Sequence, residues 1–372
     1  MQKYDVVIVG AGPAGIGVAA MLQELGVERM MILERETVGA TFTKWPKEMR
    51  FITPSFTTNF FGHLDLNAVV SGTSPAYTVR KEHPTGAEYA EYLRSVSEYL
   101  ELPITEGVNV EEIVPSEGLF TLRLTGRRTL KARFVIWAAG EFQYPNMYSI
   151  PGAQLCLHNS HVKSWKDLEG DEFAIIGGYE SGIDAAIHLS RFGKKVRVLE
   201  RDRTWHTRTT DPSENLAPFT LERLQEEMQH NCIELSGGAT VDEVKLEKGN
   251  YLIHLRGYPK PFKVPTQPIL ATGFTSSLVL VRDLFHWHEH DAYCLLNDQD
   301  ESTKTPGLFL AGPQVRHDDL IFCFIYKFRQ RFGVVANAIG TRLGMDTAIL
   351  EQYRSEGLYL DDLSCCGEEC VC

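Results

Sequence analysis

The clearest chemistry in the sequence belongs to a glycine-rich turn near its start, Gly10-Ala-Gly-Pro-Ala-Gly15. In a dinucleotide-binding turn, the first glycine permits a tight bend, the second lets the backbone approach a pyrophosphate, and the third lets a helix pack against a strand. Glu34 lies 19 residues after Gly15, the separation expected of a carboxylate that accepts hydrogen bonds from ribose hydroxyls. The pattern predicts an adenine-dinucleotide site.

A second turn, Gly177-Gly-Tyr-Glu-Ser-Gly182, repeats this pattern less regularly. Tyr179 takes the place of the middle glycine, where a side chain is expected to crowd a pyrophosphate. Glu200 favours a ribose diol and hence NADH, whereas Arg201 and Arg203 would suit the 2'-phosphate of NADPH. Two readings stay open: a nicotinamide-nucleotide site of either preference, or a domain that has kept the fold and lost the nucleotide.

A third group of residues is a run of thiols at the end of the chain. Half of the eight cysteines fall within the last eight residues, namely Cys365, Cys366, Cys370 and Cys372. We predict them as catalytic residues of a redox arm that reacts through a mixed disulfide. Two alternatives remain, a soft-metal site for zinc or copper(I) and a tail of incidental thiols.

Two strand-helix-strand units must position the glycine turns. Apolar, β-branched residues at 4–9 and 30–33 flank a helical pattern at 16–25, and the same order recurs at 173–176, 183–192 and 195–199. This arrangement predicts an α/β fold of two Rossmann-like three-layer dinucleotide-binding domains, the second inserted in the first. The predicted segments are 1–149 and 279–358 for the FAD-binding domain, 150–278 for the NAD(P)-binding domain, and 359–372 for the cysteine-rich tail.

The intervening residues carry weaker patterns. We expect a helix over 85–100, antiparallel strands over 108–130, and a long helix over about 322–343. Small-residue strand ends at 134–140 and 268–274 are typical of crossings between domains. Alternating His286, His288 and His290 favour a solvated hairpin over a metal site.

Composition excludes several classes of partner. The formal net charge of −12 provides no basic face for nucleic acid. No apolar stretch approaches the roughly 20 residues that span a bilayer, and no secretory signal pattern is present, so we expect a cytoplasmic protein without membrane partners. A chain of 372 residues is long enough for two domains, and a homodimer stays open.

The order of motifs across the chain resembles the two-dinucleotide-domain flavoproteins. It comprises Gly10–Gly15, Trp137-Ala-Ala-Gly140, Gly177–Gly182, Ala271-Thr-Gly273 and Gly307-Leu-Phe-Leu-Ala-Gly312. That superfamily includes thioredoxin reductases, flavin-containing monooxygenases and bacillithiol-disulfide reductases. The resemblance implies FAD at the first turn and NADPH or NADH at the second.

Within this superfamily the sequence departs from the disulfide reductases that carry a dithiol near the flavin. No Cys-x-x-Cys pair precedes the second turn, where only Cys156 stands, and residues 37–61 lack the cysteine pair of the glutathione-reductase type. Residues 38–46 resemble a flavin-containing monooxygenase segment, and residues 46–54 look like the bacillithiol-disulfide-reductase group. The chain is most similar to small bacterial proteins labelled flavin-containing monooxygenases that have a cysteine-rich C-terminus.

The resemblance also implies the residues that contact the cofactors. Many members place an acid after the glycine that matches Gly312; here Pro313 follows, and Asp318 or Asp319 is the expected substitute. The predicted cofactor-binding residues are Gly10, Gly12, Pro13, Ala14, Gly15, Glu34, Arg35, Thr41, Phe42, Trp45, Ala139, Gly140, Gly177, Gly178, Glu180, Ser181, Glu200, Arg201, Arg203, Thr272, Gly273, Gly312 and Lys327.

These features predict an FAD-dependent NAD(P)H oxidoreductase that passes hydride from nicotinamide to flavin and then to a small-molecule, disulfide or thiol-linked acceptor. One alternative is a monooxygenase that uses a flavin hydroperoxide. A second alternative, from a different class, is a flavin-bearing sensor or metal-handling protein with a thiol tail. No resident metal is predicted.

Overall fold

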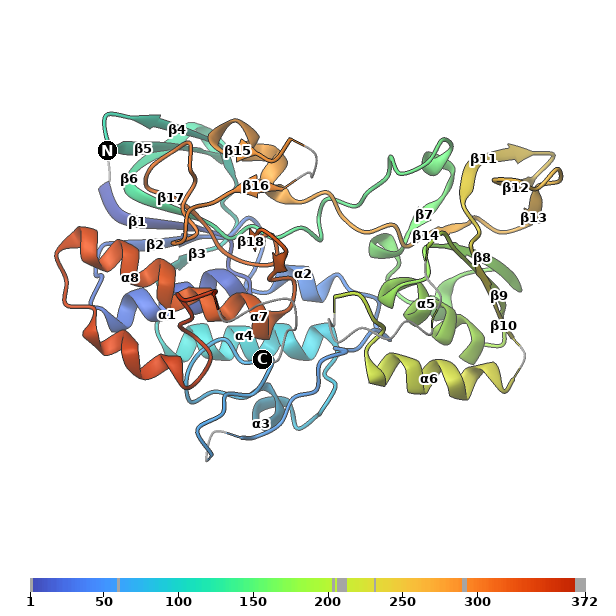
Figure 1. The fold of residues 1–372 in the computed structure, drawn as a ribbon, viewed down its shortest axis with the longest axis horizontal. Helices are drawn as coiled ribbons and strands as arrows, with labels where there is room; N and C mark the ends of the chain where they lie inside the picture. The colour runs from blue at the N-terminus through green and yellow to red at the C-terminus, as the bar shows by residue number, and fades with distance from the viewer. Residues whose placement is uncertain are drawn as a thin grey trace. The chain divides into compact units, whose positions relative to one another are not determined.

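The computed structural model describes residues 3–58, 61–202, 205, 213–230, 232–289 and 293–364 (Figure 1). The chain forms two compact units. The first consists of the described residues of Met1–Thr43, Thr53–Glu141 and Ser276–Cys372, and the second of those of Lys44–Ile52 and Phe142–Thr275. Among the described residues, no helix has both the length and the apolar character required to cross a membrane.

A mixed sheet organises the first unit. Its strands, in spatial order, are β3 (Ile104–Thr105), β2 (Met30–Leu33), β1 (Lys3–Val9), β6 (Arg128–Trp137), β5 (Leu119–Leu124) and β4 (Val110–Ser116), with β17 (Leu308–Leu310) also paired to β6. Strands β3, β2, β1, β6 and β17 are parallel, while β4 and β5 pair antiparallel. The start of β6 pairs with β5 and its end pairs with β17, so β6 belongs to both parts of the sheet.

Helices pack beside this sheet. They are α1 (Pro13–Glu24), α2 (Ala40–Thr43), α3 (Pro75–Val79), α4 (Gly86–Tyr99), α7 (Ile325–Phe328) and α8 (Phe332–Leu343). Helices α1 and α8 pack directly on one another (Figure 1). Gly17 is required at this contact, because a Cβ at this position would lie 1.9 Å from the Phe332 ring. Thr85 and Glu88 form a capping box at the start of α4. Two hairpins complete the unit, namely β15 (His286–Trp287) with β16 (Cys294–Leu295) and β18 (Arg316–His317) with β19 (Leu320–Ile321).

The second unit contains a five-stranded parallel sheet. Its order is β10 (Ile233–Gly237), β9 (Lys195–Glu200), β8 (Glu172–Ile176), β14 (Ile269–Leu270) and β7 (Leu157–His158). Helix α5 (Glu180–Arg191) packs against this sheet and against α6 (Pro218–Met228), with Ile175, Ile183 and Val198 fully buried between them. An antiparallel sheet of β11 (Val241–Glu247), β12 (Asn250–Leu255) and β13 (Phe262–Val264) covers a second apolar cluster. The predicted α/β fold of two Rossmann-like dinucleotide-binding domains, the second inserted in the first, is confirmed.

Residues 44–52 belong to the second unit, although the predicted segments placed them in the first. The Lys47 amide donates to the Lys163 carbonyl at 2.9 Å. The Glu48 carboxylate accepts from the Ser164 hydroxyl at 2.5 Å and from the Trp165 amide at 3.1 Å. These contacts join residues more than 100 positions apart, so no local sequence pattern predicts them.

The predicted helix over 322–343 is interrupted. Helix α7 begins at Ile325, and a 3-10 turn over Arg329–Arg331 separates it from α8. The guanidinium groups of Arg329 and Arg331 are both buried and bind different partners: Arg329 donates to the carbonyls of residues 64, 65 and 68, and Arg331 binds Asp300. The 3-10 turn therefore lies where two neighbouring arginines bind partners in different parts of the unit.

Candidate functional site

The first glycine turn lies where strand β1 leads into helix α1. Gly10 has φ +108°, and a Cβ there would lie 2.4 Å from the Ala138 carbonyl oxygen. A Cβ at Gly15 would lie 1.9 Å from the Gly10 carbonyl oxygen. Packing of the protein itself therefore requires glycine at both positions.

Gly12 differs from its two neighbours in the turn. No atom of the described residues lies within 4 Å of a Cβ built at this position. Helix α1 starts at the next residue, Pro13, and Gly12 has no side chain with which to cap the helix amides. The helix therefore presents open backbone and its positive dipole end to a ligand, and the turn fits the pyrophosphate of a dinucleotide.

Glu34 is held against this turn by two main-chain amides. Its Oε2 accepts from the Ala11 amide at 2.9 Å, and its Oε1 accepts from the Glu36 amide at 2.8 Å. The carboxylate therefore has a fixed position at the end of β2, next to the turn. This position suits a carboxylate that accepts hydrogen bonds from the adenosine ribose.

Three strand ends meet beside the turn. The Ala138 amide donates to the Val9 carbonyl at 2.9 Å, and the Ala311 amide donates to the Trp137 carbonyl at 3.0 Å. A Cβ on Gly312 would lie 3.3 Å from Cβ of Ala14. The carboxyl ends of β1, β6 and β17 and the first turn of α1 therefore form one cradle, which is where open α/β sheets bind their ligands.

The structure places the other residues predicted around the flavin as follows. Arg35 is exposed, Thr41 is half-buried on α2, and the buried Phe42 ring lies 4.8 Å from the Tyr89 ring. Lys327 lies on α7, which contacts α1. Trp45 belongs to the second unit, where its ring lies 5.0 Å from that of Phe51.

The expected substitute acids, Asp318 and Asp319, are exposed in the turn of the β18–β19 hairpin. A different pair, which the sequence did not single out, lies at the strand ends: Glu141 follows Gly140, and the Gln314 side chain donates a hydrogen bond to it. The only sequence signal for this pair is that each residue lies within two positions of a strand-end glycine.

The second turn repeats the geometry of the first. Gly177 has φ +103°, and its Cβ would lie 2.3 Å from the Ala271 carbonyl oxygen. A Cβ on Gly182 would lie 1.9 Å from the Gly177 carbonyl oxygen. The Tyr179 phenol donates to the Asn215 carbonyl at 2.9 Å, and its ring packs against the apolar cluster of the unit. Tyr179, which replaces the middle glycine of the turn, is therefore held by contacts within its own unit.

The Glu200 carboxylate, like that of Glu34, accepts hydrogen bonds from two main-chain amides. Its Oε2 accepts from the Gly178 amide at 2.5 Å and its Oε1 from the Asp202 amide at 3.2 Å. The Arg201 side chain forms an ion pair with Asp202, and Arg203 lies outside the described residues. The Trp205 indole donates to the Gly178 carbonyl at 2.8 Å.

Other predicted residues of this turn bind neighbouring elements. The Glu180 carboxylate accepts from the Ala217 amide at 2.5 Å and the Thr220 hydroxyl at 2.6 Å, which ties α5 to the start of α6, and burial raises its pKa. Ser181 is half-buried in the first turn of α5. The Thr272 hydroxyl donates to the Asn146 carbonyl at 3.0 Å.

A buried histidine supports the strand end after β14. Nε2 of His158 lies 3.0 Å from the Gly273 carbonyl oxygen, and Nδ1 lies 2.9 Å from the Ser160 hydroxyl. Burial lowers the pKa of His158 to about 4, so the imidazole is neutral near pH 7. His158 therefore holds Gly273 in place through a neutral hydrogen bond.

The four cysteines among the described residues differ in exposure. Cys156 and Cys294 are buried, and burial raises the pKa of each thiol to about 12. Among the described residues, no two cysteines form a disulfide and no three metal-binding side chains cluster. The tail cysteines predicted as catalytic, Cys365, Cys366, Cys370 and Cys372, lie outside the described residues, as does His290.

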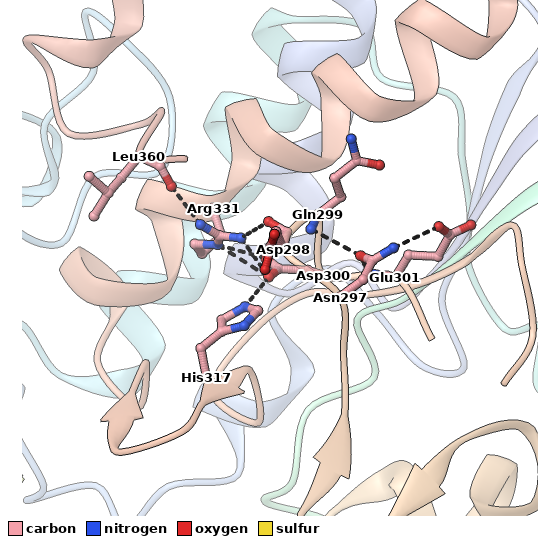
Figure 2. A network of polar contacts seen from close by, with 8 residues as sticks. All are labelled: Asn297, Asp298, Gln299, Asp300, Glu301, His317, Arg331 and Leu360. Carbon is pink, nitrogen blue, oxygen red and sulfur yellow. Dashed lines mark hydrogen bonds and ion pairs between the residues drawn. The ribbon is translucent and has the colours of Figure 1, made fainter. Parts of the chain in front are cut away.

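The segment that leads into the tail is attached to the first unit (Figure 2). The Leu360 carbonyl accepts from Arg331 at 2.6 Å, and the Leu360 amide donates to the Gln330 carbonyl at 2.8 Å. Arg331 also binds the fully buried Asp300, whose carboxylate lies 2.6 Å from Nε2 of His317. One residue further along, Asp361 makes a two-bond ion pair with Arg354 at 2.6 and 2.9 Å, so the chain is held up to residue 361.

Comparisons with known proteins agree with this geometry. Bacilliredoxin reductase Bdr of Bacillus subtilis is 21% identical over 92% of this chain and 99% of its own length. The solved bacillithiol disulfide reductase Bdr of Staphylococcus aureus is 20% identical with a TM-score of 0.76, over 92% of this chain and 99% of that one. A flavin-containing monooxygenase from Stenotrophomonas maltophilia has a TM-score of 0.70 at 15% identity, over 92% and 100% of the two chains.

These findings confirm the two-dinucleotide-domain flavoprotein superfamily. They also confirm FAD and a nicotinamide nucleotide as cofactors and NAD(P)H-dependent oxidoreduction as the activity. The two glycine turns and their amide-bound glutamates are consistent with both cofactors. A family model for pyridine nucleotide-disulphide oxidoreductases matches residues 7–312, and the chain belongs to this family.

Proposed function

We propose that this oxidoreductase reduces a disulfide or thiol-linked acceptor and that its C-terminal cysteines are the reacting thiols. Gly10–Gly15 with Glu34 would hold FAD, and Gly177–Gly182 with Glu200 would hold the nicotinamide nucleotide. When bound, these cofactors supply a two-electron transfer that consumes one NAD(P)H and one proton for each disulfide converted to two thiols.

The observation that carries this proposal is the attachment of Leu360 and Asp361, which precede the tail cysteines, to the flavin-binding unit. Leu360 and Asp361 are fixed by Arg331, Gln330 and Arg354, and the first tail cysteine comes four residues after Asp361. Of the described thiols, Cys156 and Cys294 are buried with pKa values raised far above neutrality, which makes them poor nucleophiles. The other two described thiols, Cys232 and Cys323, belong to different units, whereas the tail cysteines follow one another closely in the sequence, so the tail is the proposed source of the reactive thiol pair.

The chemistry expected of the tail is thiol-disulfide exchange. A tail thiolate attacks one sulfur of the acceptor, the acceptor disulfide breaks, and its other sulfur leaves as a thiolate that takes up a proton. A neighbouring tail thiolate then attacks the mixed disulfide, releases the second acceptor thiol, and leaves an oxidised tail pair. The two electrons from NAD(P)H restore the tail dithiol.

The comparisons favour a disulfide acceptor over oxygen insertion. Two relatives that match along almost their whole length are named as reductases of bacilliredoxin and of bacillithiol disulfide. A solved neighbour of similar coverage is a flavin-containing monooxygenase. The proposed acceptor class is a low-molecular-weight thiol disulfide or a small protein disulfide.

One assay separates the two activities. The full chain, supplied with FAD, NADH or NADPH and a panel of low-molecular-weight disulfides without oxygen, is expected to form about two thiols for each nucleotide oxidised. Nucleotide oxidation that requires oxygen and yields a hydroxylated or sulfoxidised substrate, without thiol release, would contradict the proposal in favour of the monooxygenase alternative.

We also propose that NADH is the preferred donor, because the Glu200 carboxylate is fixed by two amides where a 2'-phosphate would repel it. Glu200→Gln is expected to raise kcat/KM for NADPH relative to NADH about tenfold. Glu234→Gln, an exposed acid on the adjacent strand paired with Arg197, is the matched control and should leave the ratio unchanged. A wild-type preference for NADPH that survives both substitutions would refute this assignment.

A further inference from the structure

A carboxyl group that the turn motifs do not account for lies at the flavin cradle. Glu141 directly follows Gly140 at the end of the β6 strand, and Gln314 comes two residues after Gly312 at the end of β17. The Gln314 side-chain amide donates a hydrogen bond to Oε2 of Glu141. This bond joins the two strand-end loops that flank the cradle, so Glu141 lies at the edge where the dinucleotide is expected.

No cation among the described residues pairs with the Glu141 carboxylate. Burial raises the pKa of this carboxyl, the Gln314 hydrogen bond lowers it, and no charged side chain of the described residues contributes to the shift. Glu301 in the same unit shows the ordinary arrangement, because Arg342 binds its carboxylate at 2.5 and 2.7 Å and the pKa of that acid is lowered. Glu141 is thus a partly buried acid whose one hydrogen-bond partner among the described residues is a neutral amide.

We propose that Glu141 is an FAD-binding residue that accepts a hydrogen bond from a hydroxyl group of the sugar chain of the nucleotide. A carboxylate in this position has acceptor capacity beyond the single bond from Gln314. The strand-end edge is the side of the sheet that faces ligands, and the acids expected to fill this role, Asp318 and Asp319, are exposed on a hairpin instead.

The proposed hydrogen bond makes the affinity for FAD depend on pH in a definite direction. Without FAD, the ionised form of Glu141 is disfavoured by burial, so the group destabilises the folded apoprotein above its ordinary pKa. A hydroxyl donor from FAD favours the ionised form, so FAD binding releases a proton and the affinity for FAD increases as the pH rises through the raised pKa. A phosphate placed against Glu141 would give the opposite dependence, since it would favour the protonated form.

The test compares the full-length apoprotein and its Glu141→Gln variant. The dissociation constant for FAD is measured by flavin fluorescence from about pH 4.5, near the ordinary pKa of a glutamate, up to about pH 8.5. We expect wild-type affinity to rise with pH, and Glu141→Gln to bind FAD about tenfold more weakly at the upper pH with little pH dependence. The Glu141→Gln apoprotein should melt at the same or a higher temperature, because the variant removes a poorly solvated charge. Glu112→Gln, an exposed acid of the same unit, is the control.

FAD analogues that lack a single ribityl or ribose hydroxyl identify the donor. The analogue without the bonded hydroxyl should lose affinity for wild type and not for Glu141→Gln. Unchanged FAD affinity in Glu141→Gln, or weaker binding accompanied by a lower apoprotein melting temperature, would overturn the proposal. Should Glu141→Gln fail to fold, the pH dependence of the wild-type chain decides: FAD affinity that rises with pH supports the ligand role, and affinity that falls or stays constant refutes it.

Discussion

Removal of residues 365–372 is expected to lower the rate of NAD(P)H-dependent disulfide reduction at least about 100-fold, because the proposed nucleophile and its resolving partner are both lost. Reduction of a small artificial acceptor such as ferricyanide should persist at the wild-type rate, since such an acceptor takes electrons without a thiol. The chain is attached to the first unit up to Asp361, so truncation after Ser364 leaves these attachments intact. The measurement is the ratio of the two activities in the full and truncated chains.

Cysteine substitutions refine this result. Cys365→Ser with Cys366→Ser, and Cys370→Ser with Cys372→Ser, show which pair attacks the acceptor and which resolves the mixed disulfide. Cys232→Ser, a thiol of intermediate exposure in the second unit, is the matched control and should have no effect. A truncated chain that reduces disulfides at the full rate would refute the redox arm. If it also loses zinc or copper(I) binding, the metal-handling alternative gains support.

Gly12→Ala is expected to weaken FAD binding on the order of 100-fold while leaving the fold of the apoprotein intact, because the new methyl group enters space reserved for the pyrophosphate. No described atom lies within 4 Å of this methyl group, and Gly12 has φ −88°, which alanine adopts without strain. The only expected cost to folding is that of a poorer helix N-cap, a few tenths of a kcal/mol up to about 1 kcal/mol.

Gly15→Ala provides the contrast. Its methyl group would lie 1.9 Å from the Gly10 carbonyl oxygen, so this variant should destabilise the apoprotein itself. FAD titration and thermal melting of both apoproteins separate a ligand contact from a packing requirement. Wild-type affinity for FAD in Gly12→Ala would place the pyrophosphate elsewhere.

Features set by short-range geometry were predictable from the sequence. Each glycine turn, the helix that follows it and the acid at the next strand end lie within 25 consecutive residues, over Gly10–Glu34 and Gly177–Glu200, and the fold confirms these elements. Both glutamates bind the amide of the second residue of their own turn, which explains why one spacing rule applies to both units.

Features that depend on distant partners were not predictable. Glu141 meets Gln314 across 173 positions, and Arg329 reaches the carbonyls of residues 64, 65 and 68 across more than 260. Glu48 joins the second unit through Ser164 and Trp165. In each case one polar side chain satisfies a partner brought near only by the folded sheet, so the sequence carries no periodic or motif-like sign of it.

The most direct test of the proposed electron path is an anaerobic titration of the oxidised full chain and the truncated chain with NADH, followed by the flavin absorption band and by thiol counting. If the tail accepts electrons from the flavin, the full chain should consume about two equivalents of NADH per FAD and expose two new thiols, whereas the truncated chain should consume about one equivalent. Equal consumption by both chains, without new thiols, would contradict the account.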